Sequence, residues 1–191
     1  MADDFYTSGL NGRDIAILAQ RYRDKFDIVD QECTDIINVL EFKLPQAFPE
    51  FNLIEVQDDE LDDYARTVFE PLCIVVRQSV YDDASRGSAF SRMILAHELG
   101  HLIMHREHKN RLPAAALRKD AYTENVKNLN GKESAEAQAT QFARVFLLPI
   151  KMAFAHRNNL DSLAQRAGIP KIDASSVVNL SRRQEMYDLA K

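Results

Sequence analysis

Three of the five histidines in this chain lie within ten residues, in the segment AHELGHLIMH that ends at His105. His97 and His101 are four residues apart, so both side chains project from the same face if the segment is an α-helix. Two imidazole nitrogens on one face can bind a single metal ion, and zinc is commonly held in this way. The competing interpretation is that both histidines are hydrogen-bonded residues of the core.

Glu98 directly follows the first histidine and completes the pattern HExxH. Its carboxylate would lie beside the open coordination position of the metal rather than on the metal itself. A zinc-bound water there has a pKa of about 7, and Glu98 could take its proton as it attacks a carbonyl. Gly100 inside a helix costs about 1 kcal/mol relative to alanine, which suggests that another element packs closely there.

A hydrolytic zinc site usually has three protein ligands and one water, so a third ligand is required. The candidates are His105, His108, Glu133, Glu136 and His156. Glu136 is favoured because it lies on an apolar helical segment, where an unpaired buried carboxylate is costly and coordination would remove the cost. A solvated surface glutamate is the alternative for Glu136, with Glu133 as the next candidate. One ion per chain is expected, and Mn²⁺ or Fe²⁺ would also suit such ligands.

The surrounding sequence predicts the elements that must position these side chains. The expected fold class is α+β: a mostly helical domain with a small sheet next to the HExxH helix and a short helical C-terminal extension. Two N-terminal helices are predicted within 12–42, at 12–25 and 30–42, and LPQAFPEF then breaks the helical pattern. A small sheet follows within 51–78, with strands 51–56 and 72–78. The remaining predicted elements are an active-site helix 91–105, an irregular connection 106–131 and a third-ligand helix 132–148.

Residues 1–150 are expected to form the main domain, and residues 151–191 a helical appendage. Within the appendage, LAQRAGIP is similar to the first helix and turn of a helix-turn-helix unit. Pro170 and the few basic residues after it argue against base recognition, so we expect a packing helix pair or a substrate-docking appendage and no direct DNA binding.

Charge and composition narrow the setting. Residues 1–90 carry 8 Lys and Arg against 19 Asp and Glu, whereas residues 91–191 carry 16 against 10. The acidic half disfavours nonspecific binding to nucleic acid and would attract a basic partner, although a solvated acidic surface also explains it. Two cysteines are too few for a disulfide scaffold, and we find no signal peptide or membrane span. We therefore expect a cytoplasmic protein.

Two segments together resemble a known family. The helix from Arg92 to His105, followed by EAQATQFA from Glu136 and by Leu-Leu-Pro149, is similar to the ImmA/IrrE-like metallopeptidases. The resemblance extends over about residues 50–150 and implies a zincin-like fold. It places His97, His101 and Glu136 on the zinc ligands and Glu98 on the catalytic base. The family often has asparagine where this chain has Thr140, a position next to the ligands, and its strand before the active helix matches CIVVRQSVY only loosely.

The resemblance implies an intracellular zinc endopeptidase that cleaves a helix-turn-helix repressor, commonly encoded nearby, by Glu-assisted attack of a zinc-bound water. Such enzymes are anti-repressors of mobile elements or regulators of radiation and stress responses. A basic repressor would suit the acidic half of the chain, and strand 72–78 could pair with an extended substrate. The alternatives are a non-catalytic partner-binding or toxin-like module on the same fold and a DNA-binding regulator.

Other residues are candidates for supporting roles. His105, Tyr122 and His156 are possible donors to an oxyanion or partners of a ligand, and the sequence does not choose among them. Arg92 could orient the site or meet a substrate carboxylate, and a surface cation is equally compatible with its position.

Overall fold

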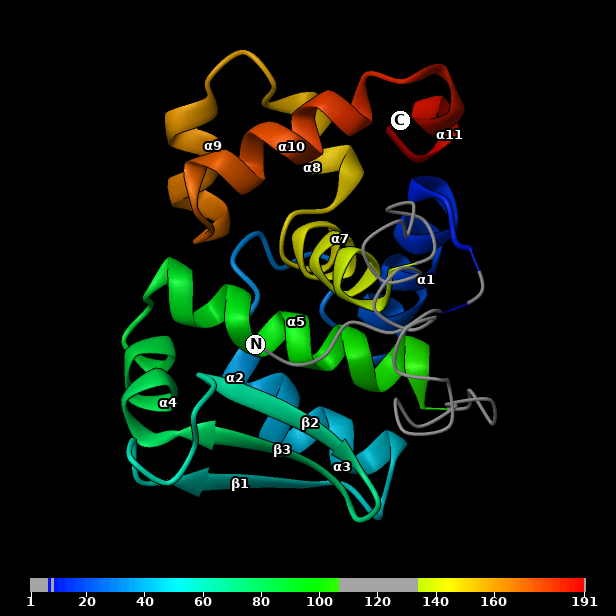
Figure 1. The fold of residues 1–191 in the computed structure, drawn as a ribbon. Helices are drawn as coiled ribbons and strands as arrows, with labels where there is room; N and C mark the ends of the chain where they lie inside the picture. The colour runs from blue at the N-terminus through cyan, green and yellow to red at the C-terminus, as the bar shows by residue number, and fades with distance from the viewer. Residues whose placement is uncertain (1–6, 8, 107–133, 191) are drawn as a thin grey trace, which may run out of the picture.

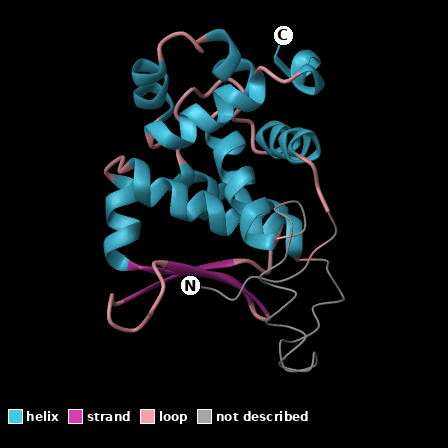
Figure 2. Cartoon of the chain, turned by 45° about the horizontal axis from the view of Figure 1, so that its top comes forward, coloured by secondary structure: helices cyan, strands magenta, loops and turns pink. Residues whose placement is uncertain are grey.

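The computed structural model of the chain describes residues 7, 9–106 and 134–190. It confirms a mostly helical α+β fold, with a small three-stranded sheet on one side of the described helices (Figures 1 and 2). Most of the predicted connection 106–131 lies outside the described residues, together with His108, Tyr122 and Glu133. Among the residues described, no helix is long and apolar enough to cross a membrane.

The strands are β1 (Asn52–Val56), β2 (Ala65–Phe69) and β3 (Leu72–Arg77). The helices before the gap in the description are α1 (Gly12–Lys25), α2 (Ile36–Asn38), the π-helical η1 (Val39–Lys43), α3 (Leu44–Ala47), α4 (Gln78–Ser85) and α5 (Ala89–His105). Those after it are α7 (Ala135–Leu147), α8 (Ile150–Ala155), α9 (Leu160–Ala167), α10 (Lys171–Ser181), the 3₁₀ helix η2 (Gln184–Met186) and α11 (Tyr187–Ala190).

The sheet has the order β1-β3-β2, which corrects the prediction that strand 72–78 accepts a substrate. β3 is the central strand: β1 pairs with it in parallel and β2 pairs with it antiparallel, so both of its edges are occupied. β2 was not predicted because only Ala65 among its residues is fully buried, and the acidic residues before it obscure the alternation of a strand. β2, an edge strand of this sheet, lies against α5 (Figure 1).

The second N-terminal helix differs from the predicted range 30–42. It begins at Ile36, where the Asp35 side chain accepts a hydrogen bond from the Asn38 amide at 3.0 Å, and it continues through Pro45 to Ala47. Proline has no N–H and its ring collides with the carbonyl one turn earlier in a regular α-helix. The wider π turn of η1, which ends at Lys43, accommodates the ring, so the helix enters LPQAFPEF and the predicted break occurs within that segment, after Ala47.

α5 and α7 form the centre of the fold, with α7 crossing α5 on the side away from the sheet (Figure 1). α5 covers the predicted helix 91–105 and begins after Ser88, whose hydroxyl accepts from the Ser91 amide. Its apolar side chains Leu95, Leu99 and Leu102 are fully buried in the same core as Phe142 and Phe146 of α7. The rigid contact between these two helices therefore sets the relative positions of every side chain on their shared face.

Two buried arginines, Arg23 of α1 and Arg92 of α5, both donate hydrogen bonds to Thr34. Arg23 donates to the Thr34 hydroxyl at 2.6 Å, and Arg92 donates to the Thr34 carbonyl at 2.6 Å and to the Gly168 carbonyl at 3.0 Å. Arg92 is only 4% exposed, so it is neither a surface cation nor a substrate-binding group. Gly168 has φ +61°, and a Cβ there would lie 1.6 Å from Arg92 Nη1, so both backbone geometry and packing require glycine.

The C-terminal helices pack onto the rest of the chain. Apolar side chains of α10, among them Ala174 and Val177, are fully buried and belong to the common core, and Arg13 of α1 binds Asp188 of α11. α9, the turn at Gly168 and α10 occupy the predicted helix-turn-helix-like segment. The predicted division of the chain at residue 150 stays a prediction.

Candidate metal centre

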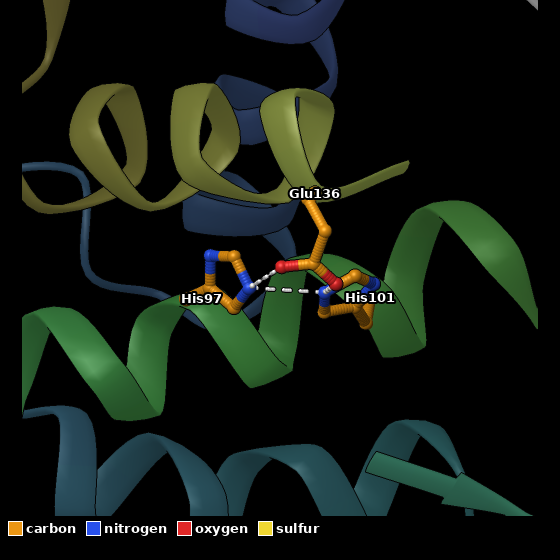
Figure 3. A group of neighbouring side chains, drawn as sticks. All are labelled: His97, His101 and Glu136. Atoms are coloured by element: carbon orange, nitrogen blue, oxygen red, sulfur yellow. Dashed lines mark hydrogen bonds and ion pairs between the residues drawn. The ribbon is translucent and has the colours of Figure 1, made fainter. Parts of the chain in front are cut away.

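His97 and His101 of α5 and Glu136 of α7 point toward one another (Figure 3). The His97 Nε2 lies 3.0 Å from His101 Nε2 and 3.2 Å from Glu136 Oε2, and His101 Nε2 lies 3.1 Å from Glu136 Oε1. These are the three side chains that the sequence favoured as ligands. The structure thus brings together residues 39 positions apart, because α7 crosses α5 at this point.

The donor set fits a zinc ion in both chemistry and spacing. Two imidazole nitrogens and one glutamate form a His₂Glu set, which is one of the catalytic zinc sets. Ligands about 2.1 Å from a tetrahedral ion are about 3.4 Å from each other, close to the separations of 3.0 to 3.2 Å found here. Among the described residues, this group could hold a metal ion, and two of its members, His97 and Glu136, line a cleft.

The charges at the site also favour an ionised carboxylate. Burial raises the pKa of the Glu136 carboxyl, but its hydrogen bonds with His101 and His97 and their charges outweigh burial. The resulting pKa lies well below the usual range of a glutamate, so Glu136 is an anion at neutral pH. A cation that binds between the histidines therefore meets a negative ligand that needs no deprotonation.

Thr140 holds the other side of the His97 ring. Its hydroxyl Oγ1 lies 3.2 Å from His97 Nδ1, one turn after Glu136 on α7. A zinc-binding histidine typically uses its second nitrogen in such a hydrogen bond, which fixes the ring orientation. The family resemblance placed Thr140 next to the ligands, and the structure agrees.

Glu98 is not part of the His97–His101–Glu136 group, and its carboxylate is hydrogen-bonded to the sheet. It is 8% exposed, and the Thr67 hydroxyl of β2 lies 2.8 Å from its Oε2 and 2.9 Å from its backbone carbonyl. The hydroxyl can donate to the carboxylate and so orient it. Sequence analysis missed Thr67 because it lies on the strand that was not predicted, and no motif marks it.

A cleft of about 500 Å³ opens over the site between β2, α5 and α10. His97, Glu98 and Glu136 line it on one side. Tyr64 and Phe90 line its outer wall, with ring centroids 5.5 Å apart and more than half of each residue exposed. The cleft therefore offers an apolar aromatic surface directly beside the polar groups.

Gly100 lies at a close approach of α5 and α7, as its position inside the helix suggested. A Cβ at Gly100 would lie 3.1 Å from the Ala139 carbonyl oxygen and 3.2 Å from Phe142 Cδ1. Such contacts are tighter than normal packing, and the helix that carries Glu136 would have to move away by a few tenths of an ångström.

We therefore expect Gly100→Ala to weaken zinc binding about fivefold or more, because overpacking costs roughly 1–3 kcal/mol. The unfolding free energy of the zinc-free protein should change less, because alanine gains about 1 kcal/mol of helix propensity. Chelator competition for zinc, together with thermal unfolding of the metal-free form, measures both quantities. Unchanged zinc affinity would mean that the α5–α7 distance does not control the site.

The remaining candidates lie elsewhere. His105 is fully buried behind His101, where it can be a partner of that ring but cannot face a substrate. His156 follows α8 and contacts Arg166, and it is not among the residues that line the cleft at His97. Arg92 is bound to backbone carbonyls as described above.

Part of the chain is similar to a known protein family. Residues 83–173 match the family Peptidase_M78, described as the IrrE N-terminal-like domain, and this range contains the three clustered side chains and Glu98. No curated protein sequence matches the chain significantly. The matched segment contains the two central helices, α5 and α7, that carry the site. Residues 83–173 are therefore similar to the ImmA/IrrE-like family, and this match supports a metallopeptidase-type domain.

Proposed function

We propose that this protein is a zinc-dependent endopeptidase in which His97, His101 and Glu136 bind the ion and Glu98 is the general base. The observation that carries the proposal is the convergence of a His₂Glu donor set with a separate carboxylate at the edge of the same cleft. The family assignment supports a peptidase, and its members are generally zinc-dependent.

The protein's own residues would divide the chemistry as follows. A zinc ion would supply a Lewis acid for the peptide carbonyl and a water of lowered pKa. Glu98 accepts a proton during attack and donates it to the departing amine, as a general base and then a general acid. Thr67 orients the Glu98 carboxylate by a hydrogen bond to its Oε2, and Thr140 holds the His97 ring.

The cleft and the edge of the sheet suit an extended polypeptide. β2 is an edge strand, and its first residue, Ala65, lines the cleft together with the preceding residue, Tyr64. A peptide that pairs with the edge of β2 would pass over the site, with alternate side chains directed into pockets. The exposed Tyr64–Phe90 pair offers a wall for a large apolar side chain of the substrate.

Charge favours a basic substrate, which supports a helix-turn-helix repressor as the target. Asp62, Asp63 and Asp173 line the cleft; Asp63 is paired with Arg66 and Asp173 with Arg144, whereas Asp62 is exposed. Together with the acidic first half of the chain, this surface attracts a cationic protein. The proposed biological role is that of an anti-repressor or a stress regulator in the cytoplasm.

The proposal is tested by incubating the zinc-loaded protein with purified helix-turn-helix repressors encoded near it, and in parallel with casein as an unfolded substrate. The expected result is cleavage of one repressor at a single bond, located by mass spectrometry and abolished by a chelator. Cleavage of casein alone would support the endopeptidase activity and contradict the proposal that a repressor is the substrate. No cleavage of either by fully loaded protein would contradict the enzymatic function.

A further inference from the structure

His105 takes no part in the chemistry proposed above, yet it is completely buried next to a ligand. Its Nδ1 lies 3.1 Å from His101 Nδ1, and its Nε2 lies 3.1 Å from the amide oxygen Oε1 of Gln138, which is also completely buried. Buried polar groups are nearly always hydrogen-bonded, and each hydrogen bond needs one donor and one acceptor. The direction of these two hydrogen bonds therefore shows which ring nitrogens carry protons.

The amide oxygen fixes that direction, because it can only accept a hydrogen bond. His105 must then carry its proton on Nε2, which leaves Nδ1 as a lone pair in the neutral ring. That lone pair can only accept, so His101 carries a proton on its own Nδ1. The neutral His101 ring then presents the Nε2 lone pair toward Glu136 and His97, as a metal ligand requires.

The opposite orientation of the amide has the opposite result. An NH₂ group facing His105 would donate to Nε2, so His105 would carry its proton on Nδ1 and donate it to His101. His101 would then hold its own proton on Nε2, at the position where a metal has to bind. The position of the oxygen in Gln138 thus determines whether His101 is prepared for a metal.

We propose that Gln138 and His105 are positioning residues that hold His101 in the tautomer able to bind the ion. The inference rests on the proposed metal site and is independent of which protein is cleaved. With it, three side chains of α7 contact the three histidines of α5: Thr140 contacts His97, Glu136 contacts both His97 and His101, and Gln138 contacts His105.

The first test uses the unaltered protein. Long-range ¹H–¹⁵N spectra of the histidine rings distinguish the two tautomers, and they are recorded for the zinc-free and zinc-loaded protein above the ordinary histidine pKa of about 6.5. The expected result is a proton on Nε2 of His105 and on Nδ1 of His101 in both forms. A proton on Nδ1 of His105 in the zinc-free or the zinc-loaded form would overturn the proposal.

The second test measures zinc affinity by competition with a chelator. Gln138→Met and His105→Phe should each weaken zinc binding by about 10- to 100-fold, the usual effect of losing a partner of a ligand. His105→Gln, which can again offer an amide oxygen to His101, should recover part of the loss. Gln141→Met is the matched control on the same helix, since Gln141 lies outside this hydrogen-bonded chain, and it should bind zinc as the wild type does.

The two proposals fail in different ways. If the wild type binds no zinc, the metal site itself is wrong. If the wild type binds zinc tightly and Gln138→Met and His105→Phe bind it equally well, the metal site stands and the positioning role is overturned. Thermal unfolding of each zinc-free variant shows whether it is folded, and the spectra of the unaltered protein decide the question even if a variant does not fold.

Discussion

Replacement of Glu98 by glutamine is expected to lower the rate of peptide cleavage by about 100- to 10,000-fold while the zinc content stays unchanged. The loss follows from removal of the general base, whose contribution typically has this size. Zinc is retained because Glu98 is not part of the His97–His101–Glu136 group, and the amide oxygen of glutamine can still accept from Thr67. Cleavage assays and metal analysis of the same preparation measure both effects.

Each other outcome has a definite meaning. A Glu98→Gln variant that cuts at the wild-type rate would place the base elsewhere, and one that loses zinc would make Glu98 a ligand. The variant also separates the enzyme from a non-catalytic binding module. In such a module, the wild type and the variant would bind the partner equally and neither would cut it.

Replacement of Arg23 by methionine is expected to lower the free energy of unfolding by about 3 kcal/mol or more. The guanidinium donates to the carbonyls of Ile28 and Gln31 at 2.7 Å and to that of Phe146, in the last turn of α7, also at 2.7 Å. Methionine has a similar length but no donor, and each buried acceptor left without a partner costs about 1–3 kcal/mol. Chemical denaturation of the metal-free protein measures the change.

Arg21→Met is the control for this variant. Arg21 is exposed on the same helix, and its replacement should change stability by less than about 0.5 kcal/mol. Burial lowers the pKa of Arg23 to about 10, below its ordinary value of 12.5, so the group stays protonated in both folded and unfolded chains at neutral pH. The effect of Arg23→Met should therefore be the same at about pH 6 and pH 8. A loss below about 1 kcal/mol would mean that the carbonyls find other donors.

The sequence predicted that His97, His101 and Glu136 lie together, because the information for this grouping is largely local. His97 and His101 share a helix face by periodicity alone, and the apolar residues around Glu136 place that carboxylate on a buried helix. Gly100 indicated a close approach, and α7 lies there. Family resemblance added the pairing of the two helices, which periodicity cannot supply.

The parts that the sequence did not predict depend on tertiary contacts. β2 has only one fully buried residue, so its alternation is weak, and it is stabilised by pairing with β3. Thr67 was missed for the same reason. The sequence position of Arg92 was compatible with a surface cation or a substrate-binding cation. Only the fold brings the carbonyls of Thr34 and Gly168 to its guanidinium. The helix after Asp35 begins late because the carbonyls of Ile28 and Gln31 are directed at Arg23.

The most direct test of the account is the metal content per chain, measured by mass spectrometry on protein purified without chelators. The wild type, Glu136→Ala and Glu133→Ala are compared side by side, because Glu133 is the other acidic candidate in the sequence. The account predicts near-stoichiometric zinc in the wild type and in Glu133→Ala, and a large loss in Glu136→Ala. Zinc lost from Glu133→Ala and kept in Glu136→Ala, or no zinc in the wild type even after zinc is added back, would contradict it.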